Sequence, residues 1–190
     1  MARNVIIIHG GDSYKKYEEY LQVLQSNPVR IKDNLKSWKS SLQTQLGDSY
    51  KVIVPEFPNP QNAHYTEWQI VFNHLKSYID EQTILIGHSL GGMFLTQYLS
   101  HNLMKIAQLH LVASGLSSEG SFLAPSDCTA IQLGSQSIHI WHSVDDEVVP
   151  FASSLALKKS IPKAHLHQFV GKGHFNQTEF PELIEMIVQC

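Results

Sequence analysis

The sequence has few cysteines, little excess charge and no long apolar run. Its 190 residues include two cysteines, Cys128 and Cys190, without a CxxC pair, so neither a disulfide framework nor a thiolate zinc site is predicted. Fourteen Lys and Arg against 17 Asp and Glu give a net charge of −3, which indicates no basic surface for nucleic acid or an anionic membrane. No segment reaches the roughly 20 apolar residues that a membrane-spanning helix needs. We therefore expect a globular protein that binds neither nucleic acid nor membrane.

No export signal is expected at the N-terminus. The apolar run at residues 5–8 is only Val-Ile-Ile-Ile, and His9, Gly10 and Gly11 follow at once, so it is too short for a secretory signal peptide. Together with the scarcity of cysteine, this favours a cytoplasmic protein in a reducing compartment.

The composition, with 43% hydrophobic and 16% charged residues, suits one globular domain spanning residues 1–190. Short β-branched and aliphatic runs alternate with helical patterns, which is typical of a parallel sheet covered by helices on both faces. We predict an α/β fold with a doubly wound, mostly parallel sheet of about six strands. The expected strands are 4–9, 51–54, 83–87, 108–113, 138–142 and 165–170.

Apolar residues at helical spacing predict the helices between these strands. Gly47 is expected to end one helix and Pro181 to open the last one. The helix that Gly47 ends has the periodic positions Leu35, Trp38, Leu42 and Leu46, and two further helices have Trp68, Phe72, Leu75 and Ile79, and Phe94, Leu95, Tyr98 and Leu99.

Two stretches do not fit a minimal alternation of strands and helices. Within residues 12–32, Tyr17, Tyr20 and Leu24 lie at helical spacing and predict an added helix. Residues 114–136 are rich in Ser and Gly and show no clear period, so they predict a long loop after a parallel strand, which is either functional or poorly ordered.

Eleven histidines are the unusual feature of the composition. Histidine in this number suggests metal binding, pH sensing or proton transfer. His165 and His167 share one face of an expected strand, but no motif such as H-E-x-x-H accompanies them, so no metal is predicted. Neither G-x-G-x-x-G nor a P-loop motif occurs, which disfavours a nucleotide cofactor.

The most informative motif is a G-x-S-x-G formed by Gly87, Ser89 and Gly91, between a buried strand pattern and an amphipathic helix. A nucleophile elbow requires this setting, because the turn is so tight that side chains two residues from the serine would collide with backbone. The motif alone also fits a glycine-rich turn with a capping serine. Its strand-turn-helix context favours Ser89 as a nucleophile at a helix N-terminus, where developing negative charge is stabilised.

A serine nucleophile needs a base and an acid that orients the base. After the strand at 138–142 come Asp145 and Asp146, and after the strand at 165–170 comes His174 in a Gly-x-Gly-His loop. Serine, acid and histidine in this order, each after a later strand, are typical of an α/β-hydrolase triad. At this point either aspartate can be the acid.

The segments GHSLGG, DDEVVP and GKGHF, in this order and spacing, resemble the α/β-hydrolase superfamily. The PEFPNP segment at 55–60 and the phenylalanine after the histidine resemble one branch, the small YdeN-like and retinoblastoma-binding-protein-9-like serine hydrolases. The resemblance covers most of the chain and is weakest at 12–32 and 114–136. It implies a trimmed α/β-hydrolase fold that lacks the first two strands of larger members.

The resemblance also implies roles for particular residues. The branch carries its acid in an Asp-x-x-Val-Pro pattern, which falls on Asp146 rather than Asp145. One oxyanion donor is expected to be the backbone N–H of Leu90, which follows the nucleophile, and the His-Gly motif of the superfamily implies Gly11 as the other. His88 is expected to orient or pack beside the base.

The function predicted from these residues is hydrolysis of a small carboxylic ester, thioester or amide through an acyl-enzyme, without metal or organic cofactor. The alternative is a binding module that retains the hydrolase fold with little turnover. Phe122, Leu123 and Phe175 are expected to line an apolar acyl site. The natural substrate and the oligomeric state do not follow from the sequence.

Overall fold

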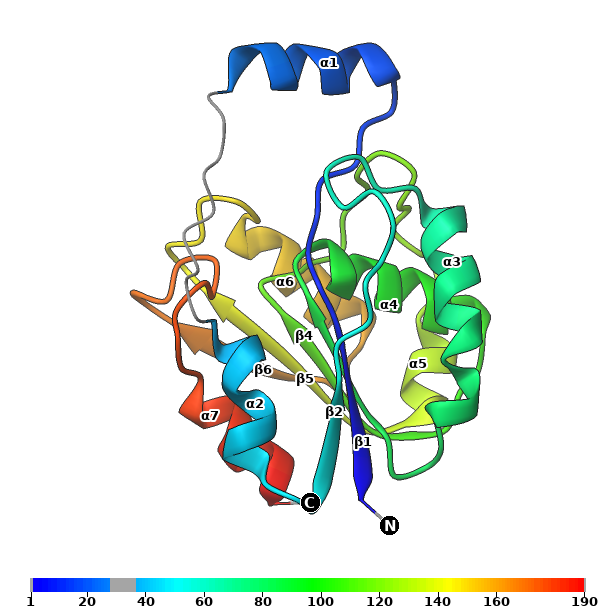
Figure 1. The fold of residues 1–190 in the computed structure, drawn as a ribbon, viewed down its shortest axis with the longest axis vertical. Helices are drawn as coiled ribbons and strands as arrows, with labels where there is room; N and C mark the ends of the chain where they lie inside the picture. Colours follow the sequence, from blue (N-terminus) through cyan, green and yellow to red (C-terminus); the bar gives the residue numbers. More distant parts are fainter. Residues whose placement is uncertain (1, 28–36, 190) are drawn as a thin grey trace.

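The computed structural model describes residues 2–27 and 37–189, and it contains a six-stranded sheet of order β2-β1-β3-β4-β5-β6 (Figure 1). All neighbouring strands in it run parallel. The six expected strands and the α/β class are therefore confirmed. The observed bounds are β1 Arg3–Ile8, β2 Tyr50–Ile53, β3 Ile84–His88, β4 Ile106–Val112, β5 Ser135–Ser143 and β6 His165–Phe169.

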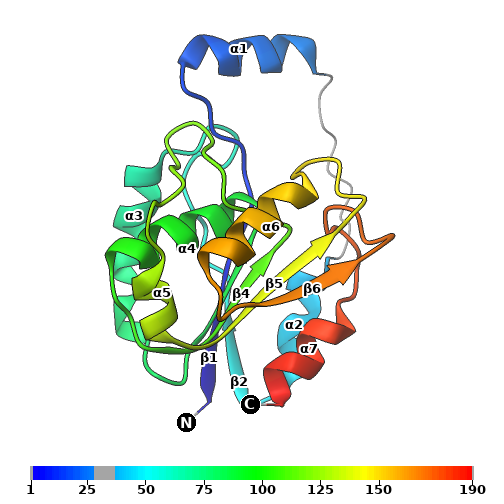
Figure 2. The same ribbon diagram turned by 180° about the vertical axis from the view of Figure 1, so that it is seen from behind.

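Helices cover both faces of the sheet (Figures 1 and 2). The helices α2 (Trp38–Leu46) and α7 (Pro181–Val188) pack against one face, and their apolar residues share a core cluster with Val5 and Ile7. Ile6 and Ile8 point to the opposite face and its separate cluster. Since successive strand residues face opposite sides, burial of both sets explains the continuous apolar run of β1. The helices of that opposite face are α3 Tyr65–His74, α4 Leu90–His101, α5 Thr129–Gly134 and α6 Phe151–Ser160.

The helix covering the β2 side of the sheet follows its predicted register. Trp38, Leu42 and Leu46 of α2 are buried at a spacing of four residues, and Gly47 follows as the C-cap with a φ of 68°. The expected fourth position, Leu35, lies outside the described residues. The Trp38 indole Nε1 donates a hydrogen bond of 2.9 Å to the carbonyl oxygen of Phe175. This bond ties α2 to the loop between β6 and α7.

The helix α3 is shorter than its apolar pattern predicted. The spacing predicted helical residues as far as Ile79, but α3 ends at His74 and a 3₁₀ turn, Lys76–Tyr78, follows it. The turn ends at Ile79, whose N–H bonds the carbonyl of Lys76, and the next strand starts at Ile84. Such 3₁₀ turns are frequent at the C-terminal ends of α-helices.

Both irregular stretches contain helix. The predicted added helix is confirmed as α1 (Tyr17–Ser26), which has no buried residue and stands apart above the sheet (Figures 1 and 2). The end of that stretch, residues 28–32, lies outside the described residues. In the stretch 114–136, which predicted only a loop, the chain forms α5, and Ser135 already begins β5. A helix of six residues is too short to show a clear period. None of the helices described is long and apolar enough to cross a membrane.

Candidate active site

Ser89 sits in a strained turn between β3 and α4. Its backbone has φ 55° and ψ −123°, a conformation that costs a non-glycine residue about 1–3 kcal/mol. The Ser89 N–H bonds the carbonyl of Val112 at 2.9 Å, which ties the turn to β4. A Cβ added at Gly87 would lie 2.6 Å from the Cα of Gly92, and one at Gly91 would strike the end of β1. The motif glycines are therefore required by close backbone contact, as an elbow demands.

The loop after β1 lies directly against this turn. A Cβ built on Gly10 would be 3.0 Å from the Cβ of Ser89, and one built on Gly11 would collide with the carbonyl oxygen of Pro60. The N–H of Asp12 bonds that same oxygen at 2.9 Å, so the segment after β2 holds the loop in place. Gly11 was predicted from the sequence, but the close approach of Gly10 to the serine was not, although the His-Gly-Gly run indicated a tight backbone turn here.

Leu90 is the first residue of α4, so its N–H lies in the helical turn whose donors have no intrahelical acceptor. The same turn carries the positive end of the helix dipole. The Leu90 side chain is buried, with its Cδ2 3.5 Å from the Cβ position of Gly11. The two expected oxyanion donors thus belong to neighbouring backbone segments beside Ser89.

Asp146 is the aspartate that contacts the histidine. The Nδ1 atom of His174 lies 2.9 Å from Oδ2 and 3.0 Å from Oδ1 of Asp146, which is buried in the turn after β5. The backbone N–H groups of Val148 and Val149 donate to Asp146 Oδ1 at 2.8 and 3.0 Å. These four contacts hold the carboxylate in one orientation toward the imidazole.

Asp145 has a different set of contacts. Its Oδ1 accepts hydrogen bonds from the Ser143 hydroxyl and, at 2.8 Å, from the N–H of Gly171. These bonds, with that of the hydroxyl first, lower the pKa of the Asp145 carboxyl. The Ser143 hydroxyl in turn accepts from the N–H of Lys172 at 3.1 Å. Asp145 therefore fastens the start of the loop that carries His174.

His88 forms a hydrogen bond to the loop that carries His174. Its Nε2 lies 2.9 Å from the carbonyl oxygen of His174, and because a carbonyl only accepts, this nitrogen carries the proton. Burial, followed by the charge of Lys39, lowers the pKa of His88 well below its ordinary value, so the ring stays neutral. The two imidazole centroids are 5.0 Å apart. This contact agrees with the orienting or packing role expected for His88.

The three expected acyl-site residues do not form one wall. Phe122 is fully buried in the cluster beneath α3 and α4, and Phe175 is fully buried in the cluster on the other face of the sheet. Leu123 is 58% exposed, and its N–H donates to Gln97 Oε1 at 2.8 Å. The structure therefore places the two aromatic rings in the core and leaves only Leu123 with an exposed side chain.

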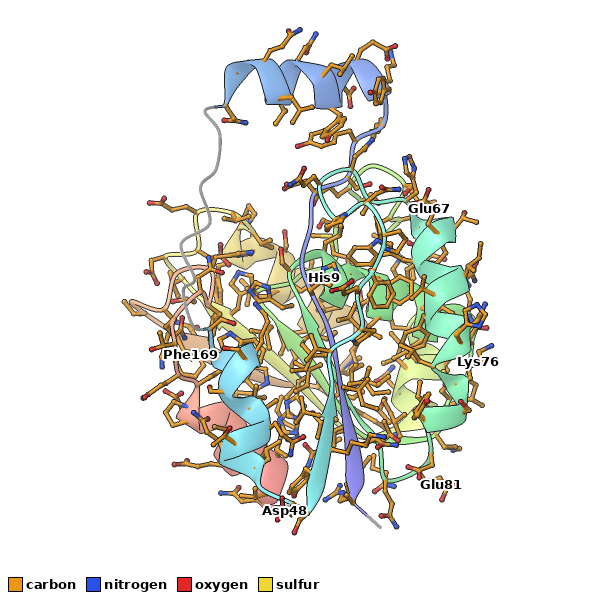
Figure 3. All side chains as sticks on the ribbon, viewed as in Figure 1. His9, Asp48, Glu67, Lys76, Glu81 and Phe169 are labelled. Atoms are coloured by element: carbon orange, nitrogen blue, oxygen red, sulfur yellow. The ribbon has the colours of Figure 1, made fainter. Side chains whose placement is uncertain are left out.

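A cavity of about 630 Å³ lies beside the loop after β1. Its wall includes Asn59 and Pro60 from the segment that holds this loop, and Tyr17 and Tyr20 from α1. Glu67 at the start of α3 also lines it, and Figure 3 shows Glu67 and His9 in the half of the molecule away from Asp48 and Glu81. Sequence reasoning missed this cavity because its walls come from three separate segments.

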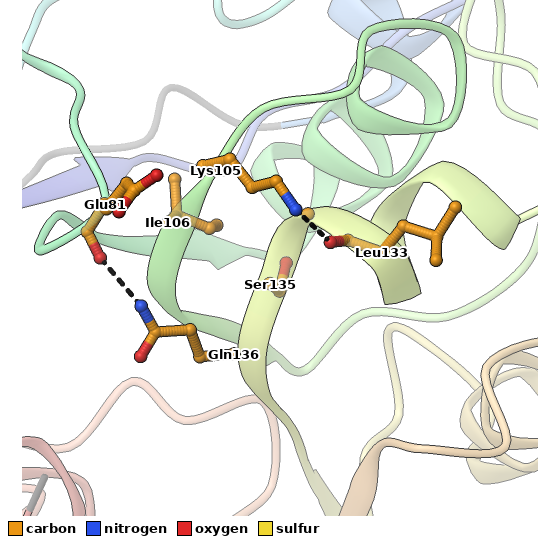
Figure 4. Close-up of a pocket in the computed structure, with 7 residues that line it drawn as sticks. Glu81, Lys105, Ile106, Leu133, Ser135 and Gln136 are labelled. Atoms are coloured by element: carbon orange, nitrogen blue, oxygen red, sulfur yellow. Dashed lines mark hydrogen bonds between the residues drawn. The ribbon is translucent and has the colours of Figure 1, made fainter.

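A smaller recess of about 240 Å³ lies at the other edge of the sheet, where β4 and β5 begin (Figure 4). Two of its polar side chains have backbone partners: Lys105 Nζ donates to the Leu133 carbonyl at 2.9 Å, and Gln136 Nε2 donates to the Glu81 carbonyl at 3.2 Å. The described residues contain no group of three or more His, Cys, Asp and Glu side chains arranged to hold a metal ion. The elbow of Ser89 and the contact between His174 and Asp146 thus remain the candidate active site.

Two curated proteins are similar to this chain in sequence. The rat protein Serine hydrolase RBBP9 is 28% identical over 144 residues, covering 73% of this chain and 76% of its own. Putative hydrolase YdeN of Bacillus subtilis strain 168 is 26% identical over 147 residues, covering 70% and 75%.

Solved structures show the same fold. The crystal structure of the ydeN gene product from B. subtilis superposes with a TM-score of 0.80 at 22% identity, over 99% of this chain and 98% of that one. The meta-cleavage product hydrolase CumD of Pseudomonas fluorescens IP01 superposes with a TM-score of 0.68 at 17% identity, over 99% and 90%. The model of the family described as Serine hydrolase matches residues 32–186. The chain therefore belongs to the serine hydrolase family, in the YdeN-like and RBBP9-like branch of the α/β-hydrolases.

Proposed function

We propose that this serine hydrolase cleaves small carboxylic esters, and by the same chemistry thioesters or small amides, with a triad of Ser89, His174 and Asp146. The observation that supports the proposal most directly is the contact between His174 Nδ1 and both oxygens of a buried Asp146, in the loop that also touches His88 below the elbow. A strained serine at a helix N-terminus and an oriented imidazole are the two parts that acyl transfer needs.

The proton transfers follow from which ring nitrogen of His174 already carries a proton. Because Asp146 accepts the Nδ1–H of His174, the neutral ring presents an unprotonated Nε2 to the serine hydroxyl. Nε2 takes the Ser89 proton as Oγ attacks the carbonyl carbon, and the Asp146 carboxylate stabilises the imidazolium that forms. The imidazolium then protonates the leaving alcohol, thiol or amine, and an acyl-enzyme remains on Ser89.

The tetrahedral intermediate places negative charge on the former carbonyl oxygen. In our proposal the backbone N–H groups of Leu90 and Gly11 donate to it, and the N-terminal dipole of α4 adds to this stabilisation. Water then attacks the acyl-enzyme while His174 takes its proton, and the serine is released in its starting form.

The substrate is proposed to be small. Phe122 and Phe175 are fully buried, so of the three apolar residues predicted at the acyl site only Leu123 offers an exposed side chain. We further propose that the leaving group enters the cavity beside the loop after β1, because its mixed lining of tyrosine, amide and carboxylate groups suits a polar group better than a long acyl chain.

The direct test is labelling of the purified protein with a fluorophosphonate, followed by identification of the modified residue. We expect a single adduct on Ser89 and none in the Ser89→Ala variant. The variant Ser100→Ala is the matched control, because Ser100 lies near the other end of the same helix α4 and should still label at Ser89. Folded protein that does not label at Ser89 would instead support the non-catalytic binding module.

Substrate class is tested with p-nitrophenyl esters of increasing acyl length, a thioester and an aminoacyl p-nitroanilide. We expect kcat/KM to be highest for short acyl groups and to be lost in Ser89→Ala. A rate that keeps rising with acyl length would contradict a small substrate, whereas turnover by Ser89→Ala would contradict the nucleophile assignment.

A further inference from the structure

His142 is a second histidine on the triad carboxylate, and the mechanism above does not use it. It lies near the end of β5 and is fully buried. Its Nε2 is 3.5 Å from Asp146 Oδ2 and 2.9 Å from the carbonyl oxygen of Val149. Its Nδ1 is 3.3 Å from the carbonyl oxygen of Ser114. Three segments of the chain therefore meet on this one ring.

The partners of His142 define its protonation. Carbonyl oxygens only accept hydrogen bonds, and a neutral imidazole carries a single N–H. Both ring nitrogens of His142 face a carbonyl, from Ser114 on one side and Val149 on the other, so only the imidazolium donates to both. A neutral ring would leave a buried carbonyl and a buried nitrogen lone pair facing each other, which is unfavourable.

A buried imidazolium also needs a counter-charge, and Asp146 supplies it. Asp146 is the acidic residue with an oxygen within 4 Å of the His142 ring in the part of the chain that the structure describes. The neighbouring Asp145 is engaged by Ser143 and Gly171, and from α6 the ring is met edge-on by the apolar ring of Phe151 at 5.7 Å.

We propose that His142 is a positioning residue held as an imidazolium, so that the Asp146 carboxylate is shared between His142 and His174. This inference rests on the proposed function. The shared contact at Oδ2 fixes the carboxylate, and the charge of His142 offsets part of the negative field that Asp146 exerts on His174. The base consequently stays neutral, and active, at lower pH than it would beside an uncompensated carboxylate.

The test is the pH dependence of kcat/KM for p-nitrophenyl acetate in His142→Gln. Glutamine keeps an amide donor for a carbonyl but carries no charge. The two imidazole nitrogens lie no farther apart than the sum of their distances to Asp146 Oδ2, which are 3.5 and 2.9 Å. For charges at that separation in an effective dielectric of about 20, loss of His142 should raise the midpoint of the acid limb by about two pH units.

The matched control is His167→Gln, which replaces a partly buried histidine on β6 whose partner is His139 and not the triad. The acid limb of this variant should coincide with that of the wild type. An unchanged acid limb in His142→Gln, with Ser89 still labelled by the fluorophosphonate, would overturn the proposed role of His142.

A second measurement needs neither turnover nor a folded variant. Nitrogen-15 NMR of the imidazole groups in wild-type protein at pH 7.5 should show His142 with protons on both ring nitrogens. A singly protonated ring would overturn the inference. Two protons on His142 combined with no labelling of Ser89 would instead refute the proposed hydrolase function and leave the charge on His142 intact, so the two failures are distinguishable.

Discussion

Replacing His139 with phenylalanine should make the fold less sensitive to acid. His139 stacks between His110 and His167 on the face of the sheet that α2 and α7 cover, with ring centroids 5.0 and 5.3 Å away. Its Nδ1 shares a hydrogen bond of 3.0 Å with His167 Nε2. Its Nε2 is buried with no hydrogen-bond partner in the described part of the structure. Phenylalanine keeps a planar ring in the stack and removes the titrating nitrogens.

Proton linkage explains why His139 makes the folded protein less stable in acid. Burial, followed by the charges of His167 and His165, lowers the pKa of His139 from 6.5 to about 4 in the folded protein. Between these values the unfolded chain binds a proton that the folded chain does not, so acid favours unfolding. The contribution of His139 is complete above its unfolded pKa and is lost as the pH falls toward its folded pKa.

The size of this stability change follows from the unfolded and folded pKa values of His139. For a pKa that falls from 6.5 to about 4 on folding, linkage predicts a loss of about 2 kcal/mol between roughly pH 7.5 and pH 5. His139 is only 5% exposed, but its neighbour His165 is exposed to solvent, which screens charge in this stack. Allowing for that screening, we expect about 1–2 kcal/mol of the acid sensitivity to disappear in His139→Phe.

The assay is urea denaturation followed by circular dichroism at pH 7.5 and pH 5.0. Changes between the two pH values are compared, so a constant packing cost of the larger phenylalanine cancels. His101→Gln, which removes an exposed histidine at the end of α4, is the control and should keep the wild-type difference. An equal loss of stability on acidification in His139→Phe and in the wild type would refute the reasoning.

Three further outcomes are expected. Asp146→Asn should lower kcat/KM for p-nitrophenyl esters by about 10⁴-fold, because the amide has no negative charge and turns its NH₂ group toward His174 Nδ1, which favours the wrong tautomer of the base. Asp145→Asn keeps an oxygen for the loop and should cost less than about tenfold; equal losses would contradict the assignment. Gly11→Ala forces a Cβ onto the Pro60 carbonyl, and kcat should fall about 10²-fold with the circular dichroism unchanged; a normal kcat would contradict the oxyanion role. Trp38→Ala should destabilise the fold by about 3–5 kcal/mol in urea titrations, and a loss below about 1 kcal/mol would contradict its place in the core.

The sequence already contained the layout of the sheet. The strands β1, β3 and β4 are short runs buried on both faces, so their positions could be predicted without knowledge of their neighbours, whereas the edge strands β2 and β6 are only partly buried. The elbow motif was also readable from the sequence, although only Gly87 is constrained by backbone within a few residues, whereas Gly91 is constrained by the distant end of β1. Local signals failed where an element was short, as in α5, or where a helix changed to a 3₁₀ turn, as after α3.

The direction of side chains at the strand ends was decided only by the tertiary structure. Asp145 and Asp146 are adjacent in sequence, yet one binds the backbone of a loop and the other faces His174. The chain turns immediately after β5, so the alternation that orients side chains along a strand no longer applies there.

The burial of two aromatic residues and the contacts of His142 likewise could not be predicted from local sequence. Phe122 and Phe175 are apolar residues in loops, which fits an open pocket as well as a core, and only packing against other segments buried them. In the sequence, nothing distinguishes His142 from the other histidines on expected strands. Its contacts depend on Ser114, which comes from the loop after β4, and on Asp146, which the turn after β5 brings back onto the ring. The sequence by itself determined the order of strands, nucleophile, acids and base along the chain, because those signals are local. Only folding decided which groups share a hydrogen bond, because such contacts join residues far apart in the chain.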